Sequence, residues 1–264
     1  MMKSVLMILG VLLVLVSCEK VIEIDLNNAN PQIVVESELF KGENKFKVKL
    51  SYTSSFFKEE EQAFISDATV TLTEVGGEST NINYLDSGLY VLDNYIARDN
   101  KDYTLDVVVD GVTYSSTATM PAAVMLDSLV SRPLDGTFGP GDGFIVFMYW
   151  QDDPDVNNYY RAIVTLNGEE LRSREDVYIL DDNFTNGGSI EIPLFTQIFE
   201  QGDTVDVNFV SIDPKAYDYL LTLNTIIGNG QPSAAPANPN SNFSNNALGY
   251  FALYNGGVER VIIE

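Results

Sequence analysis

Short segments in which apolar and polar side chains alternate recur along most of the chain, and this pattern constrains the fold more than any other feature. Lys45–Leu50 and Ala68–Thr73 alternate with a period of two, as strands with one buried face do. Turn residues separate such segments about every ten residues. Two of the turns, Asp110-Gly111 and Asn167-Gly168, are typical of hairpins. The sequence therefore predicts a mostly β protein.

Two mainly β regions are expected, with a boundary at Pro121. Residues 31–121 are predicted to form a β-sandwich, because closely spaced short strands and regular turns are typical of that architecture. Within them Ala68–Met120 resembles the transthyretin-like β-sandwich, so an immunoglobulin-like or transthyretin-like sandwich is expected. Residues 122–264 are predicted to form a second, mainly β domain. Further strands are expected at Ile33–Leu39, Ser87–Val91, Tyr103–Val109, Val112–Met120, Phe144–Trp150, Tyr159–Leu166, Val177–Leu180, Ser189–Leu194, Thr204–Ile212, Tyr250–Tyr254 and Val258–Ile263.

One helix is expected in the second region, at residues 214–227. Asp213 is a favourable N-cap, and Pro214 occupies the first helical position, where its missing N–H costs no hydrogen bond. Gly228 is expected to end the helix. The following segment, Gly228–Ala247, is rich in Asn, Pro and Ser, and loops of that length are usually functional or disordered.

The N-terminus has the layout of an export signal. Lys3 supplies a positive charge, Val5–Val16 is an apolar run, and Ser17-Cys18 follows it. Residues 1–17 are predicted to be a lipoprotein signal peptide, Cys18 the lipidated residue that anchors the protein to a membrane, and residues 18–30 a tether. A transmembrane helix, which needs about 20 apolar residues, and a plain secretory signal are the alternatives.

Charge and composition exclude several classes of function. The formal charge is −23, and a polyanion repels nucleic-acid backbones, so no nucleic-acid partner is expected. The chain has no histidine and one cysteine, which excludes Ser-His-Asp and Cys-His catalysis. Carboxylates, Lys or Tyr could still act as general acids or bases. We expect a protein that is not an enzyme and needs no cofactor, with calcium as the one ion to consider.

The densest acidic segment is the candidate calcium site. Asp153, Asp155 and Asn157 have the alternate spacing of the first three ligands of a calcium loop. Such a loop also needs Gly at its sixth position and Glu at its twelfth, where this chain has Asn158 and Val164. The alternative is an Asp-Pro turn held by Asx hydrogen bonds. Residues 181–183, Asp-Asp-Asn, are a weaker copy of the pattern.

Aromatic residues provide the candidate contacts for a ligand or partner. Phe56 and Phe57 lie between strands and point opposite ways if extended, which would place one of them at the surface as a binding contact. A loop folded back on the core is the alternative. Phe243 is isolated among Ser and Asn in the long loop, where it anchors either into the core or into a partner. Residues 159–161, Tyr-Tyr-Arg, could stack on a sugar or pair with a carboxylate, although packing along a strand also explains them.

Several of these segments together resemble a family of lipoproteins from Bacteroidota, the domain of unknown function 4249. The resemblance covers nearly the whole chain and implies a companion of TonB-dependent outer-membrane transporters, placed in the outer membrane with its body facing the cell exterior. No part of the resemblance is a catalytic signature. It rests on Cys18, Ile33–Glu36, Ala68–Val70, Gly88–Tyr90, Met120-Pro121, Asp153-Pro154, Asn158–Arg161, Gly202-Asp203, Ser241–Phe243 and Gly249–Phe251.

Three functions are therefore considered. The first is an accessory or ligand-capturing lipoprotein that works with a TonB-dependent nutrient transporter. The second is a structural or adhesive cell-surface module made of β-sandwiches. The third is a glycan hydrolase that uses paired carboxylates, which the missing histidine and thiol make the least favoured.

Overall fold

The computed structural model describes residues 31–54, 63–134, 142–172, 177–194, 197–228 and 238–264. These residues are mainly β-strands with one helix, which confirms the predicted fold class. The described elements are β1 (Ile33–Phe40), β2 (Lys45–Tyr52), β3 (Thr69–Glu74), β4 (Ser79–Asp86), β5 (Leu89–Asp93), β6 (Asp102–Val109), β7 (Val112–Thr119), β8 (Ser128–Pro133), β9 (Phe144–Gln151), β10 (Tyr159–Leu166), β11 (Glu169–Glu170), β12 (Tyr178–Asp181), β13 (Ser189–Pro193), β14 (Thr204–Ser211), α2 (Pro214–Gly228) and β15 (Leu248–Ile262).

Strands β1 to β7 form a sandwich around a first core. They follow the order β1-β2-β5-β4-β3-β6-β7 along a curled sheet. Side chains from both ends of this sheet enter the same core, with Val35 and Phe46 on β1 and β2 and Leu72 and Leu105 on β3 and β6. The N-terminal β-sandwich predicted from the alternating pattern is therefore confirmed.

A second core lies between two groups of strands in the later part of the chain. Strands β13, β9 and β8 form a separate three-stranded sheet, and β10 and β14 belong to the end of the large sheet. The indole of Trp150 on β9 packs against Phe209 on β14, with ring centroids 4.8 Å apart, and against Tyr160 on β10 at 5.5 Å. These rings join the two sheets across the second core.

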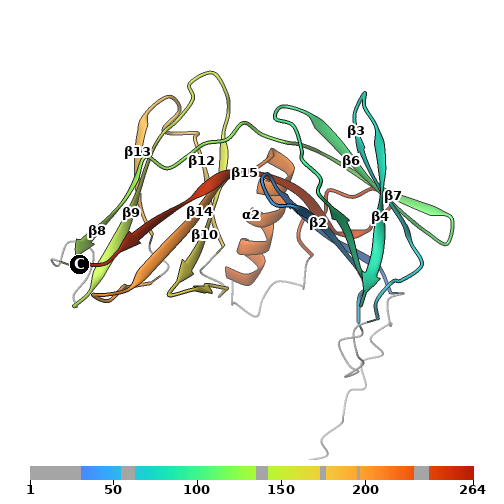
Figure 1. The fold of residues 1–264 in the computed structure, drawn as a ribbon, viewed down its shortest axis with the longest axis horizontal. Coiled ribbons are helices and arrows are strands. Elements are labelled where there is room, and N and C mark those ends of the chain that lie inside the picture. Colours follow the sequence, from blue (N-terminus) through green and yellow to red (C-terminus); the bar gives the residue numbers. More distant parts are fainter. Residues whose placement is uncertain (1–30, 55–62, 135–141, 173–176, 195–196, 229–237) are drawn as a thin grey trace, which may run out of the picture. The chain divides into compact units, whose positions relative to one another are not determined.

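The long strand β15 connects the two groups of strands, and Figure 1 shows it passing from one to the other. Its residues 248–254 pair in parallel with β1, and residues 255–262 pair antiparallel with β14. The two separate strands expected here are thus one strand. A Cβ on Gly256 would lie 1.9 Å from the carbonyl oxygen of Phe209, so glycine permits close strand pairing at this position and makes no turn.

The helix α2 begins and is capped as predicted. The Asp213 Oδ1 accepts hydrogen bonds from the backbone N–H groups of Lys215, at 3.0 Å, and Ala216, at 3.3 Å. Ala216 and Leu220 belong to a third small core together with residues of β15. Within the described ranges, no helix has the length and apolar character needed to cross a bilayer.

The predicted division at Pro121 stays a prediction. Contacts group residues 31–264 in one compact unit, and one sheet runs through both regions. The first core is built mainly from residues before Pro121, but Phe243 and Phe251 also belong to it. The C-terminal residues therefore complete the N-terminal sandwich.

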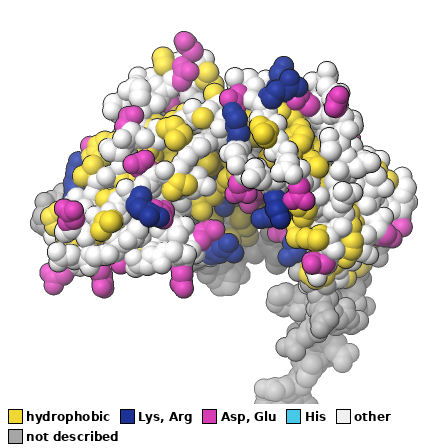
Figure 2. Space-filling view, viewed as in Figure 1, with side chains coloured by type: hydrophobic (Ala, Val, Ile, Leu, Met, Phe, Trp, Pro, Cys, Tyr) yellow, Lys and Arg dark blue, Asp and Glu magenta, His cyan; other side chains and the backbone are white. Residues whose placement is uncertain are grey.

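The acidic excess is spread over the surface. Figure 2 shows Asp and Glu side chains over much of the visible face, among many uncharged side chains and fewer Lys and Arg. A charge of −23 distributed in this way attracts cations and repels anions over the molecule as a whole.

Candidate functional site

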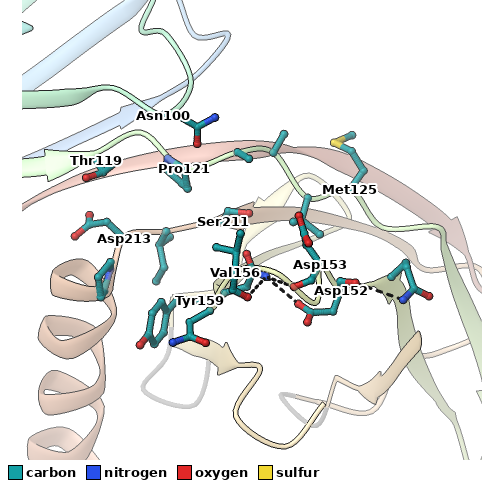
Figure 3. A pocket seen from close by; sticks show the side chains of 18 of the residues that line it. Asn100, Thr119, Pro121, Met125, Asp152, Asp153, Val156, Tyr159, Ser211 and Asp213 are labelled. Carbon is teal, nitrogen blue, oxygen red and sulfur yellow. Dashed lines mark hydrogen bonds between the residues drawn. The ribbon is translucent and has the colours of Figure 1, made fainter. Parts of the chain in front are cut away.

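A cavity of about 630 Å³ lies where four segments of the chain meet. These are the connector after β7, the loop between β9 and β10, the end of β14 and the first residue of α2. Figure 3 shows Asp213 on one side of the cavity, Asp152 and Asp153 on the other, and Ser211 between them. The candidate calcium segment thus forms part of its wall.

Asp152 fixes the loop between β9 and β10. Its side chain is buried and accepts hydrogen bonds from the Tyr160 hydroxyl, from the Asn158 side-chain amide at 3.2 Å and from the Gly187 N–H at 2.8 Å. Burial and this hydrogen bond to Asp152 raise the pKa of the Tyr160 hydroxyl well above its usual range. Both oxygens of Asp152 are therefore occupied by donors of the protein itself.

Asp182, which follows β12, joins the loop after that strand to the same wall of the cavity. Its buried carboxylate accepts the backbone N–H of Asn158 at 2.7 Å. Asp181 next to it accepts the Tyr217 hydroxyl at 2.8 Å. The side chains of residues 181 and 182 thus join loops and strands, as structural carboxylates do.

The predicted calcium ligands form a turn. Asp153, Asp155 and Asn157 are all exposed. The Asp153 Oδ1 accepts the N–H of Asp155 at 3.0 Å, which is the Asx hydrogen bond of the alternative interpretation. Over the described residues, no three acidic, His or Cys side chains are grouped so that they could hold a metal. Calcium at this segment stays a prediction.

Two polar atoms at the cavity have no hydrogen-bond partner among the described residues. They are the Ser211 Oγ and the Asp213 Oδ2, both in buried side chains. Burial raises the pKa of the Asp213 carboxyl to about 6, although the helix N–H groups oppose this shift. Both atoms have almost no accessible surface, so they are unsatisfied polar atoms beneath the cavity wall.

A second cavity, of about 820 Å³, lies on the face of the large sheet formed by β1, β2, β10, β14 and β15. Arg161 donates to the Glu38 carboxylate at 2.9 Å and to the Tyr254 hydroxyl at 2.8 Å. Although burial opposes its charge, Tyr254 and Glu38 raise the pKa of Arg161 above its usual range. Five cationic residues line this cavity together with five acidic ones: Lys45, Lys47, Lys49, Arg161, Arg172, Glu36, Glu38, Glu43, Glu170 and Asp206. This face is charge-balanced, and its arginine is held by the protein.

The aromatic candidates are placed by packing where the structure describes them. Tyr160 enters the second core, and Tyr159 packs on Tyr217 with ring centroids 4.8 Å apart. Phe243 is 8% exposed and belongs to the first core. Of the two anchors considered for Phe243, this placement favours the core, because almost none of its surface is left for a partner. Phe56 and Phe57, like Cys18, lie outside the described residues.

Asparagine side chains hold the loop around Phe243. The Asn242 amide pairs with both the N–H and the carbonyl of Phe251, at 2.9 and 2.8 Å. Asn245 donates to the carbonyl of Thr113 on the edge strand β7 at 2.7 Å. The second half of the Asn/Pro/Ser segment therefore covers the edge of the first sandwich, which protects that edge from pairing with another chain.

The sequence indicated Asp213 as a helix cap but did not indicate that its second oxygen is free. Ser211 was not predicted to lie at the cavity either, although the pattern of residues along β14 points to it. Val205, Val207 and Phe209 alternate along β14 toward the second core, and Ser211 is the next residue in that row. A polar residue at the end of an apolar row marks the point where the core ends and the cavity begins.

The chain is similar to solved structures of fibronectin type-III domains and to one family model. A two fibronectin type-III domain segment from chicken tenascin is 13% identical with a TM-score of 0.24, covering 69% of this chain and 91% of that one. The chicken CNTN1 FN1–FN3 domains are 8% identical with a TM-score of 0.29, covering 69% and 60%. No curated protein matches the chain. A family model described as a domain of unknown function, DUF4249, matches residues 19–260.

Proposed function

The chain belongs to the DUF4249 family, and we propose that it is an outer-membrane lipoprotein that captures a ligand as the accessory partner of a TonB-dependent nutrient transporter. The observation that carries this proposal is the cavity of about 630 Å³ beside Ser211 and Asp213. Sites for small ligands are concavities of about this size, with apolar walls and a few polar groups that fix orientation. The accessible polar residues Asp153, Asn157 and Asn158 line this cavity and supply such groups.

The membrane attachment rests on Cys18. Its thiol and new amino group would carry two or three acyl chains, which give stable anchoring where one chain does not. Cys18→Ser is expected to release the protein from the outer membrane. Sedimentation of that variant with outer membranes in high salt would contradict the lipid anchor.

Binding is favoured over catalysis by the state of the buried carboxylates. A glycan hydrolase needs two carboxyl groups that exchange protons with substrate or water. Both oxygens of Asp152 accept hydrogen bonds from the protein, and one oxygen of Asp182 accepts a backbone N–H. These contacts suit residues that hold loops together.

One observation favours the alternative of an adhesive surface module. Phe184 is 99% exposed, and Val156, on the adjacent loop, is 52% exposed. Gly187 packs against Pro154, so these two loops lie side by side. Exposed apolar side chains on adjoining loops suit a protein contact.

The partner is tested by capture from solubilised outer membranes, with the mature lipoprotein as bait. Recovery of a TonB-dependent transporter supports the proposal. Recovery of fibre or pilus subunits in its place would favour the adhesive alternative. The matched bait Phe184→Ser shows whether the exposed apolar loops make the contact, since it removes the largest apolar side chain there without changing the charge.

A further inference from the structure

The chain enters the first sandwich beside a segment that extends the sheet at that end. The backbone N–H of Thr53 donates to the Gln32 carbonyl at 2.9 Å, and the N–H of Tyr52 donates to the Ala63 carbonyl at 2.8 Å. Segments that are hydrogen-bonded in this way lie about 5 Å apart. Phe64, which follows Ala63, therefore lies about two strand spacings from the point where the chain enters the sandwich.

Three large apolar or aromatic side chains are exposed at this end of the sandwich. Phe64 is 41% exposed, Tyr84 is 45% exposed and Leu85 is 61% exposed. Tyr84 and Leu85 belong to the last residues of β4, before its turn into β5. A Cβ on Gly88 in that turn would lie 3.0 Å from a ring atom of Phe64, so the turn and Phe64 adjoin. We call Phe64, Tyr84 and Leu85 the tether-end patch.

The charges beside the tether-end patch suit a zwitterionic lipid headgroup. The exposed Lys49 has its Nζ 5.5 Å from the centroid of the Phe64 ring. Asp86, which follows Leu85, and Asp67 are exposed as well. A headgroup with a phosphate and an ammonium offers an opposite charge to the lysine and to the aspartates. A purely anionic surface would be repelled by the aspartates.

The proposed lipid anchor can bring this end of the sandwich to the bilayer. Residues 18–30 span at most about 45 Å when fully extended. Val75, which follows β3, lies at the opposite end of the sandwich, because β4 runs from the Val75 end to Leu85. Eight residues of strand separate the two ends by about 25 Å. The shortest path from Cys18 therefore leads to the tether-end patch.

We propose that the tether-end patch rests on the membrane surface, with Phe64 and Leu85 inserted among the headgroups of zwitterionic lipids. This inference rests on the lipid anchor of the proposed function and adds the orientation of the folded body on the bilayer. Aromatic side chains and the long stem of lysine favour this depth, because their apolar parts contact lipid while their polar ends stay in water.

Tryptophan quenching by brominated lipids tests this orientation in the lipidated protein. The probe is a vesicle of phosphatidylcholine and phosphatidylethanolamine with bromine on the acyl chains, which quenches tryptophan only at close approach. Leu85→Trp is expected to lose at least half of the emission of its added tryptophan. The matched control is Val75→Trp, because Val75 is 54% exposed and lies at the opposite end, and its added tryptophan should lose less than a tenth.

The native Trp150 is 1% exposed and lies in the second core, so the unsubstituted protein supplies its background emission. Equal quenching of the two added tryptophans, or no quenching at residue 85, would overturn the proposal.

Hydrogen exchange of the unsubstituted protein keeps the test valid if the tryptophan variants fold poorly. Amides of residues 85–88 should exchange at least threefold more slowly in the vesicle-bound lipoprotein than in the free Cys18→Ser form. Amides of residues 75–78 should exchange at the same rate in both. Exchange at residues 85–88 that does not slow on vesicles would contradict the proposal.

Vesicle flotation of the same samples separates this claim from the lipid anchor. Flotation without quenching at residue 85 would contradict the orientation and leave the anchor standing. Failure of the lipidated protein to float would contradict the anchor and the orientation together. Slow exchange at residues 85–88 that appears only with added transporter, or only at high protein concentration without lipid, would assign the patch to the transporter or to a second copy and overturn the proposal.

Discussion

Two buried carboxylates line the same cavity from opposite sides, and the protein holds them in different ways. Asp152 gives both oxygens to donors of its own chain, namely Tyr160, Asn158 and Gly187. Asp213 gives one oxygen to the helix and keeps the other without a partner among the described residues. The first arrangement uses a carboxylate to fix a loop. The second leaves one carboxylate oxygen buried without a hydrogen bond.

The difference shows that burial alone does not identify a binding group. Both side chains are buried, at 2% and 4% exposure. They differ in how many of their oxygens the protein satisfies, and this sets what each residue contributes. Removing a satisfied group should lower stability, whereas removing an unsatisfied group should cost little stability.

The largest effect is expected from Asp152→Ala. This change leaves the Tyr160 hydroxyl and the Gly187 N–H without their acceptor, and each unsatisfied buried group costs about 1–3 kcal/mol. We expect the free energy of unfolding to fall by about 3 kcal/mol or more in urea denaturation. The exposed neighbour Asp153→Ala is the control, with a loss below about 1 kcal/mol. Equal losses of unfolding free energy in the two variants would contradict the claim that Asp152 stabilises the loop through its buried hydrogen bonds.

Asp213→Ala should have a smaller effect, because it removes the helix cap. Losing a cap costs about 1–2 kcal/mol in a folded protein. Asp213→Asn retains a capping oxygen and should cost a few tenths of a kcal/mol. Measured at pH 5, the two variants should therefore differ by about 1 kcal/mol. If both lost as much stability as Asp152→Ala, Asp213 would be a satisfied structural group like Asp152.

The free energy of unfolding should depend on pH through the titration of Asp213. Burial raises its folded-state pKa to about 6, above that of an unfolded Asp. Between these values the folded state holds a proton that the unfolded state has lost, so this group makes the protein more stable as pH falls through 6. Relative to Asp213→Asn, the wild type should gain about 1 kcal/mol from pH 7 to pH 5. The opposite sign would show a carboxylate stabilised in its charged form.

The smallest effect is expected from Ser211→Ala, which removes a hydroxyl with no partner among the described residues. Stability should stay within about 0.5 kcal/mol of wild type, or rise. Ser37→Ala is the matched control, because the Ser37 Oγ donates to the Lys47 carbonyl at 3.3 Å and is equally buried. That variant should lose about 1 kcal/mol. A larger loss in Ser211→Ala than in Ser37→Ala would mean that Ser211 has a structural partner.

Alternation along the chain was enough to predict most of the strands, but not β4, β8, β11 or the continuity of β15. In β4, Ile82 is the one buried residue, and the strand forms because β3 and β5 supply its hydrogen bonds. In β15, Gly256 and Gly257 suggest a turn, although they serve close packing against β14 and Met125. Long-range pairing decides both cases, and single-sequence periodicity cannot register it.

The candidate site was predictable in part. Asp213 was expected as a cap because Asp-Pro before a helical pattern has a local meaning. Its free oxygen depends on which segments surround it, and no local pattern carries that information. The Asp153 segment was noticed for its spacing, yet the residue that organises the loop is Asp152, whose partners include Gly187 from the loop between β12 and β13.

The most direct test of this account is a carbon NMR titration of the Asp213 side-chain carboxyl in the intact protein. The account predicts an apparent pKa of about 6, because burial disfavours the charged carboxylate more than the helix N–H groups favour it. An Asp213 pKa in the ordinary range for Asp would contradict the claim that this carboxylate is buried with one oxygen unpaired.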